Sequence, residues 1–165
     1  MPTLEQTNRQ AANLYWLAFL LTGNRETSLD AAVEALDAPD GNPFFSAWML
    51  AWSRKVVIAK ALAAIRVELA ASAQRIAEAR SRKSASPSGN WTPARDVTKA
   101  ELERALLAID AFPRCVLLLS LFEGLSIDDA TVLLDVDRDL VRKAQAFALA
   151  ELTTNLAGMG NASHA

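Results

Sequence analysis

Residues 112–152 constrain the fold of this chain more than any other segment. An apolar run at 115–122 is followed by Gly124, and glycine is the residue that most often ends a helix. Ser126 with Asp129 three residues later is the arrangement that begins a helix by capping its first backbone amides. The segment therefore predicts a helix, a glycine turn and a second, short helix.

The same segment continues into a longer amphipathic helix. Asp137 is a residue type that caps helices, and apolar residues recur after it at three- and four-residue steps. Two helices joined by a tight turn and braced by a preceding helix predict a helix-turn-helix, a common DNA-binding motif. Spacing alone leaves open a generic helical hairpin that does not bind DNA. The expected inward positions are Val141, Ala144, Ala148 and Leu152.

Composition favours an all-α fold. The chain has 165 residues, of which 52% are hydrophobic and 22% charged, so it has room for one or two small domains. Leucine and alanine dominate, and no segment shows the polar–apolar alternation of a half-buried strand. The net charge of −2 gives the molecule as a whole no attraction for nucleic acid.

Neither catalysis nor metal binding has support in the sequence. Cys115 is the only cysteine, and its place in an apolar run predicts a buried side chain; the only histidine is His164. No nucleophile, base or glycine-rich phosphate loop accompanies the carboxylates, so we expect a protein that is not an enzyme and has no cofactor or metal. The apolar octet 14–21 is far shorter than the roughly 20 residues of a membrane span. Together with the lack of a signal-peptide pattern, this predicts a cytoplasmic protein.

Three helices are predicted before a linker rich in serine, proline and glycine. The first spans 4–21, the second begins at Thr27, and the third runs without interruption from Ser46 to about Ala79. The second helix is expected to turn Leu29, Ala32, Val33 and Leu36 inward. These patterns predict two small helical domains at 1–83 and 97–157, a linker at 84–96 and a flexible tail at 158–165.

Charge is distributed unevenly along the chain. Residues 1–43 carry a net charge of −4, whereas residues 44–83 carry +6. An acidic segment followed by a basic helix is typical of a chain that binds protein through the acidic segment and nucleic acid through the basic helix. A solvated helix surface that is balanced by its acidic neighbour explains the same pattern.

Residues 123–126 form the turn Glu-Gly-Leu-Ser, which is flanked by Arg114, Asp128 and Arg142. In this pattern residues 109–142 resemble region 4, the promoter-recognition domain of extracytoplasmic-function sigma factors, and the turn is the most specific match. The chain differs from the family at Asp110, Asp135 and Phe147, where the family has proline, glycine and arginine.

The N-terminal part resembles region 2 of the same family. The matching residues are Leu14-Tyr15 with Ala18, then Leu21-Thr22-Gly23-Asn24-Arg25, then Asp30. In that family an acidic helix at this place binds the clamp of the polymerase β′ subunit. The resemblance therefore implies Asp30 and Glu34 as polymerase-binding residues. It also implies Arg54, Lys55 and Lys60 for the −10 promoter region and Arg138, Arg142, Lys143 and Gln145 for the −35 region.

The resemblance implies a sigma factor-like transcription initiation protein. Its expected partners are core RNA polymerase, promoter DNA and, by family habit, an anti-sigma protein. Residues 126–165 nevertheless carry a net charge of −3, and the turn between Asp135 and Asp139 is acidic. The alternative is therefore a degenerate sigma-like protein-interaction module that does not recognise promoters.

Overall fold

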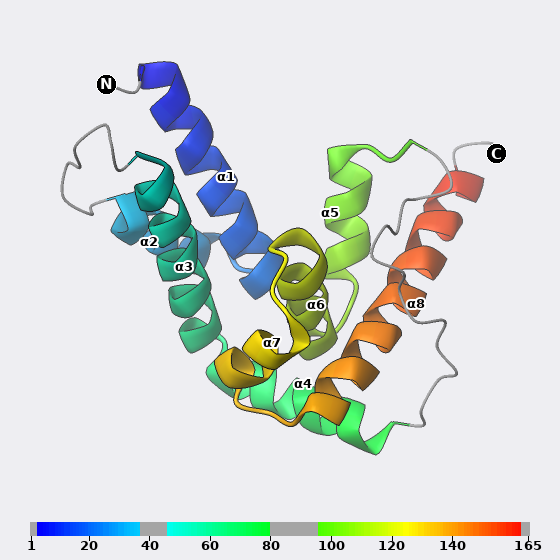
Figure 1. Ribbon diagram of the computed structural model, residues 1–165. Coiled ribbons are helices and arrows are strands. Elements are labelled where there is room, and N and C mark those ends of the chain that lie inside the picture. The colour runs from blue at the N-terminus through cyan, green and yellow to red at the C-terminus, as the bar shows by residue number, and fades with distance from the viewer. Residues whose placement is uncertain (1–2, 37–45, 80–95, 163–165) are drawn as a thin grey trace. The chain divides into compact units, whose positions relative to one another are not determined.

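The computed structural model describes residues 3–36, 46–79 and 96–162 (Figure 1). These ranges contain helices and turns but no strand, which confirms the predicted all-α class. None of the described helices is long and apolar enough to cross a membrane. The elements are α1 (Leu4–Thr22), α2 (Arg25–Leu36), α3 (Ser46–Ala64), α4 (Arg66–Glu78), α5 (Lys99–Leu107), α6 (Ala111–Leu117), the π-helical turn η2 (Leu118–Phe122), α7 (Ile127–Leu134) and α8 (Arg138–Ala162).

The chain divides into two compact units, Met1–Arg66 and Val67–Ala165. This division differs from the predicted domain boundary at residue 83, because α4 belongs with the C-terminal helices rather than with α1–α3. The predicted linker at 84–96 lies outside the described residues except for Asp96. The N-terminal unit accordingly ends within the predicted third helix, and the rest of that segment belongs to the C-terminal unit.

The N-terminal unit consists of α1, α2 and α3, each packed against the other two. Leu14, Leu17 and Leu21 of α1 are buried in its core. Gly23 ends α1 with a φ of 69°, because glycine adopts left-handed backbone without strain. The buried hydroxyls of Thr22 and Ser28, 3.1 Å apart, then fasten the end of α1 to the start of α2.

The inward face of α2 differs from the prediction. Ala32 is buried, as predicted, and the side chain of Leu36 lies outside the described residues, but Leu29 and Val33, which were also expected to point inward, are 56% and 49% exposed. Ala32 is one of four small buried residues at i, i+3, i+4 and i+7 spacing, which form a stripe beside the predicted one. Small side chains let helices approach closely, so α2 packs through backbone proximity rather than large apolar groups. These four residues are Ser28, Ala31, Ala32 and Ala35.

The predicted third helix, 46–79, is in fact two helices. Helix α3 ends at Ala64 and α4 begins at Arg66, with a turn at Ile65 between them. Neither proline nor glycine marks this break, and it coincides with the division between the two units. The interruption therefore follows from tertiary packing, which a helix-favouring sequence does not reveal.

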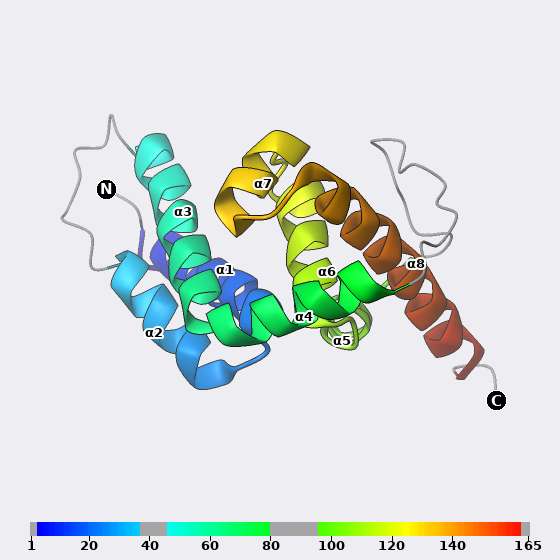
Figure 2. The same ribbon diagram turned by 90° about the horizontal axis from the view of Figure 1, so that it is seen from below.

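The C-terminal unit packs α4, α5, α6 and α7 around α8 (Figure 2). Phe112 and Val116 of α6 lie in a core cluster that also contains Ile76 of α4. The predicted inward stripe of α8 is confirmed, since each of its four residues is at most 1% exposed. Thr98 caps α5 through reciprocal hydrogen bonds with Glu101. Helix α8 is thus held along its length by the rest of the unit.

Cys115 is completely buried, as predicted, and burial raises the pKa of its thiol to about 12. Because only a thiolate reacts readily with thiol reagents, we expect Cys115 of the native protein to resist modification at mildly alkaline pH. Addition of denaturant should make it react at the rate of a free thiol. Colorimetric thiol titration with and without denaturant measures this, and rapid labelling of the native protein would contradict the burial.

Candidate nucleic-acid interface

The helix-turn-helix is formed by α7, a tight turn and α8. Ser126 caps α7 by accepting a hydrogen bond from the Asp129 amide at 3.1 Å, and the Asp137 carboxylate accepts one from the Leu140 amide at 2.9 Å. Both caps confirm the sequence prediction. The turn itself passes through Asp135, which has a φ of 54°. The family that this segment resembles has glycine here, and aspartate is among the few other residues that tolerate this conformation.

The core beneath this motif holds its two helices together. Ala130 of α7 and Val141 and Ala144 of α8 are nearly inaccessible to solvent and belong to one cluster with Phe112. Small residues at the crossing allow α7 to sit close to α8. The outward side chains of α8 are therefore presented from a rigid base, which any surface recognition of DNA requires.

Arg138, the first predicted DNA-binding residue of α8, is paired with α7. Its Nη1 lies 2.8 Å from Oδ1 of Asp128. Both side chains are more than half exposed, so the ion pair adds little to stability. Its main effect is electrostatic, because the carboxylate neutralises a guanidinium that was expected to meet phosphate.

Lys143 and Gln145 also make contacts within the unit. The Lys143 ammonium donates hydrogen bonds to the carbonyl oxygen of Ala77, at 3.2 Å, and to that of Ala79, both at the end of α4. The Gln145 amide donates to the Ser120 hydroxyl at 3.2 Å. Both side chains are thus engaged within the unit, although both were predicted to reach DNA.

Arg142 is the exception among the four predicted residues of the −35 site. It is exposed and makes no hydrogen bond or ion pair with another described residue. Asp129, Asp135 and Asp139 are exposed on the same two helices and the turn. The helix-turn-helix therefore offers one unengaged cation among several carboxylates, which is a weak surface for phosphate.

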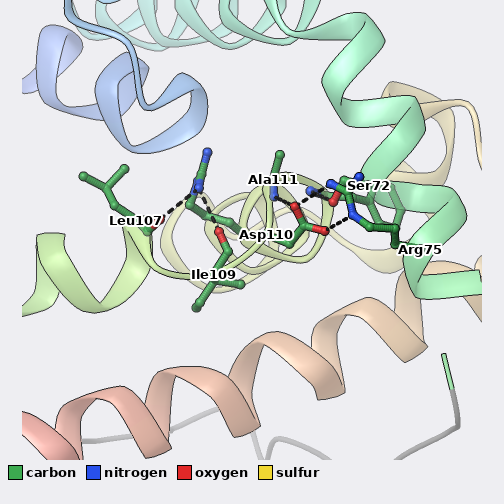
Figure 3. Close-up of polar contacts among 8 residues, drawn as sticks. Ser72, Arg75, Leu107, Ile109, Asp110 and Ala111 are labelled. Atoms are coloured by element: carbon green, nitrogen blue, oxygen red, sulfur yellow. Dashed lines mark hydrogen bonds and ion pairs between the residues drawn. The ribbon is translucent and has the colours of Figure 1, made fainter.

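A polar junction joins α4 to the start of α6 (Figure 3). Arg75 donates from Nε and Nη2 to the two carboxylate oxygens of Asp110, each at 2.8 Å, and the Ser72 hydroxyl accepts from the Phe112 amide at 2.8 Å. Asp110 also caps α6 through the Ala111 amide. Sequence reasoning noted only that Asp110 replaces a proline, since nothing in the sequence links it to a residue 35 positions earlier.

The junction predicts a pH dependence of stability. The hydrogen bonds from Arg75, assisted by Ser72 and the Ala111 amide, hold the pKa of Asp110 below its ordinary value despite partial burial. Stability from this ion pair is therefore fully present above the unfolded-state pKa of about 3.9 and is lost as the pH falls through the lower folded-state value. Asp110→Asn keeps a capping side chain but should remove this part of the acid sensitivity, as measured by denaturant unfolding across acidic pH. Equal acid sensitivity in both proteins would contradict the assignment.

Arg114 is a family-matching residue with a structural role. Its side chain is buried, and Nη1 donates to the Ile109 carbonyl oxygen at 2.8 Å. A buried carbonyl without a donor costs about 1–3 kcal/mol, so Arg114 fixes the turn between α5 and α6. The match at this position is thus explained by the fold of the unit rather than by DNA contact.

The predicted polymerase-binding and −10 residues lie on the N-terminal unit. Glu34 of α2 and Lys60 of α3 pair with each other, with Nζ 2.7 Å from Oε1. Asp30 is exposed and makes no ion pair or hydrogen bond through its side chain with another described residue. Lys55 is also exposed, and Arg54 is half-buried. The structure therefore brings one residue of each predicted group into a single ion pair.

Arg54 lines a cleft of about 250 Å³ between α1 and α3. The described residues that line the cleft include no carboxylate, and Arg9 adds a second guanidinium to it. Sequence reasoning missed Arg9, although a polar stripe at i, i+3, i+4 and i+7 spacing was visible in the first helix. That stripe consists of Gln6, Arg9, Gln10 and Asn13.

Comparisons with protein-family models, curated proteins and solved structures find no significant match to this chain. Within the described ranges, no group of three or more histidine, cysteine, aspartate or glutamate residues could hold a metal ion. Inferences about function therefore depend on the residues and on the sequence resemblance alone.

Proposed function

We propose that this chain is a sigma factor-like transcription protein. Its N-terminal unit binds core RNA polymerase, and its C-terminal unit presents α8 to promoter DNA. The observation that carries the proposal is the helix-turn-helix of α7 and α8, which lies in the segment that resembles sigma region 4. Such a protein acts in the cytoplasm, and an anti-sigma protein is the regulator that the resemblance implies.

The outward face of α2 supports the polymerase half of the proposal. Leu29 and Val33 are one turn apart and about half exposed, and the exposed Asp30 lies beside them. Apolar side chains that remain in solvent with an acidic neighbour suit a protein partner that offers an apolar groove and a cation. This is the helix that the resemblance assigns to the polymerase clamp.

The DNA half of the proposal requires help from the polymerase. Arg142 can contact phosphate directly, and Arg138 can do so once it has separated from Asp128. Together they provide at most a few phosphate contacts from α8. Tight DNA-binding proteins make about 6–10 such contacts. Binding of the isolated chain to promoter DNA is therefore weak, and delivery by the polymerase supplies the missing affinity through effective concentration.

A second candidate is a sigma-like interaction module that does not recognise promoters. The observation that favours it is the engagement of Arg138, Lys143 and Gln145 within the unit. Both candidates share the sigma-like scaffold. They differ in whether Arg142 contacts DNA.

Replacement of Arg142 tests that difference. Arg142→Gln should weaken binding to duplex DNA uniformly across sequences and lower the slope of log affinity against log salt by about 1, as expected for one lost phosphate contact. Fluorescence anisotropy over a salt series measures both quantities. Arg25→Gln, an equal loss of charge at an exposed site on the N-terminal unit, is the control. If the two variants bind DNA identically, the interaction module is the better account.

A further inference from the structure

We propose that α4 is an autoinhibitory clasp on the helix-turn-helix. Its carboxyl end holds Lys143 of α8 and keeps that helix from contacting DNA. The inference rests on the proposed function for what α8 binds. The contacts of the clasp belong to the C-terminal unit and are independent of that function.

The contact between Lys143 and α4 is favourable for two reasons. The last turn of a helix has backbone carbonyls without intrahelical partners, and the helix dipole places partial negative charge there. The Lys143 ammonium satisfies two such groups, on Ala77 and Ala79. The same carbonyls repel phosphate. While α4 is in place, Lys143 is engaged by these carbonyls, and the electronegative end of α4 lies next to α8.

The attachment of α4 is small enough to open. Only Ser72 and Ile76 of its thirteen residues are buried. Leu69 and Ala73 are only partly buried against the core cluster, and the Arg75–Asp110 ion pair lies at the surface, with side chains 57% and 37% exposed. Elements with few buried apolar contacts belong to the low-stability end of a structure and open locally. Figure 2 shows α4 as a separate rod beside α6 and α8.

The chain also provides a route by which a partner can release the clasp. A single residue, Ile65, separates α4 from α3, which belongs to the core of the N-terminal unit. A partner that binds the N-terminal unit more tightly when α4 is open would release the clasp through this connection. Polymerase binding through α2 would in this way be linked to exposure of Lys143.

The test loosens the clasp without changing α8. Arg75→Gln removes the ion pair with Asp110, whereas the control Arg66→Gln removes the same charge from an exposed residue of the same helix that has no described partner. The rate at which an amine-acylating reagent modifies Lys143 is followed by mass spectrometry, with the exposed Lys55 as internal reference. We expect acylation of Lys143 to be roughly two- to fivefold faster in Arg75→Gln than in the native chain, as for the loss of one well-aligned surface ion pair. The control should match the native rate.

DNA binding provides the second readout. Removing a cation should weaken binding to duplex DNA, as it will in Arg66→Gln, so tighter binding by Arg75→Gln can come only from release of α8. The gain should vanish in Arg75→Gln/Lys143→Met. Equal rates of Lys143 acylation in Arg75→Gln and Arg66→Gln would overturn the clasp. It would also be overturned if Lys143 of Arg75→Gln were acylated faster but the DNA affinity of this variant fell as much as that of Arg66→Gln. Faster acylation in a set of proteins that all fail to bind DNA would support the clasp while refuting the proposed DNA contact.

Discussion

Phe112→Ala is expected to lower the free energy of unfolding of the C-terminal unit by about 3–5 kcal/mol. Phe112 is 1% exposed and lies in the cluster that joins α4, α6, α7 and α8. Removing the ring leaves a cavity among residues that cannot all move to fill it. Since whole domains are stable by only about 5–15 kcal/mol, the variant should be close to unfolding in this unit.

Phe122→Ala is the matched control for that experiment. It removes the same ring from the end of η2, where the side chain is 45% exposed, and should cost less than about 1 kcal/mol. Hydrogen exchange of the α6 and α8 amides reports on the C-terminal unit separately from α1–α3. A similar cost for both phenylalanines would contradict the described core.

Charged substitutions on α2 are expected to have the largest functional effect. Leu29→Asp and Val33→Asp should each weaken binding to core RNA polymerase roughly tenfold or more, the size of effect found at the centres of protein interfaces. Both side chains are about half exposed, so the folded unit accommodates the change. Sedimentation or biolayer interferometry with purified core polymerase measures the affinity.

The control for these variants is Leu4→Asp. Leu4 is 85% exposed on α1 of the same unit, so the substitution introduces the same charge at a different surface. It should leave polymerase affinity unchanged. Equal losses in Leu4→Asp and Leu29→Asp would show that α2 is not the polymerase-binding face.

Local features of the fold could be predicted from the sequence because their determinants are adjacent in the chain. The caps by Ser126 and Asp137 each depend on a residue three positions later, and the buried stripe of α8 depends on helical periodicity. Cys115 was likewise placed correctly by its apolar neighbours. Within one element, sequence spacing is nearly the same as spatial proximity.

Features that depend on distant residues could not be predicted in this way. The partner of Lys143 lies 66 residues earlier, and that of Arg75 lies 35 residues later. In α2 the stripe of small residues faces the core, rather than the stripe with Leu29 and Val33, because neighbouring helices approach the small residues closely. Arg138 and Lys143 therefore looked available for DNA until their partners were known.

The most direct test of the central claim is binding of the purified chain to core RNA polymerase, followed by transcription from a panel of promoters. The sigma factor-like account predicts a stable complex that starts transcription at a subset of promoters and loses this activity with Arg142→Gln while polymerase binding persists. Binding without initiation would leave only the interaction module. Failure to bind core polymerase at all would contradict the account.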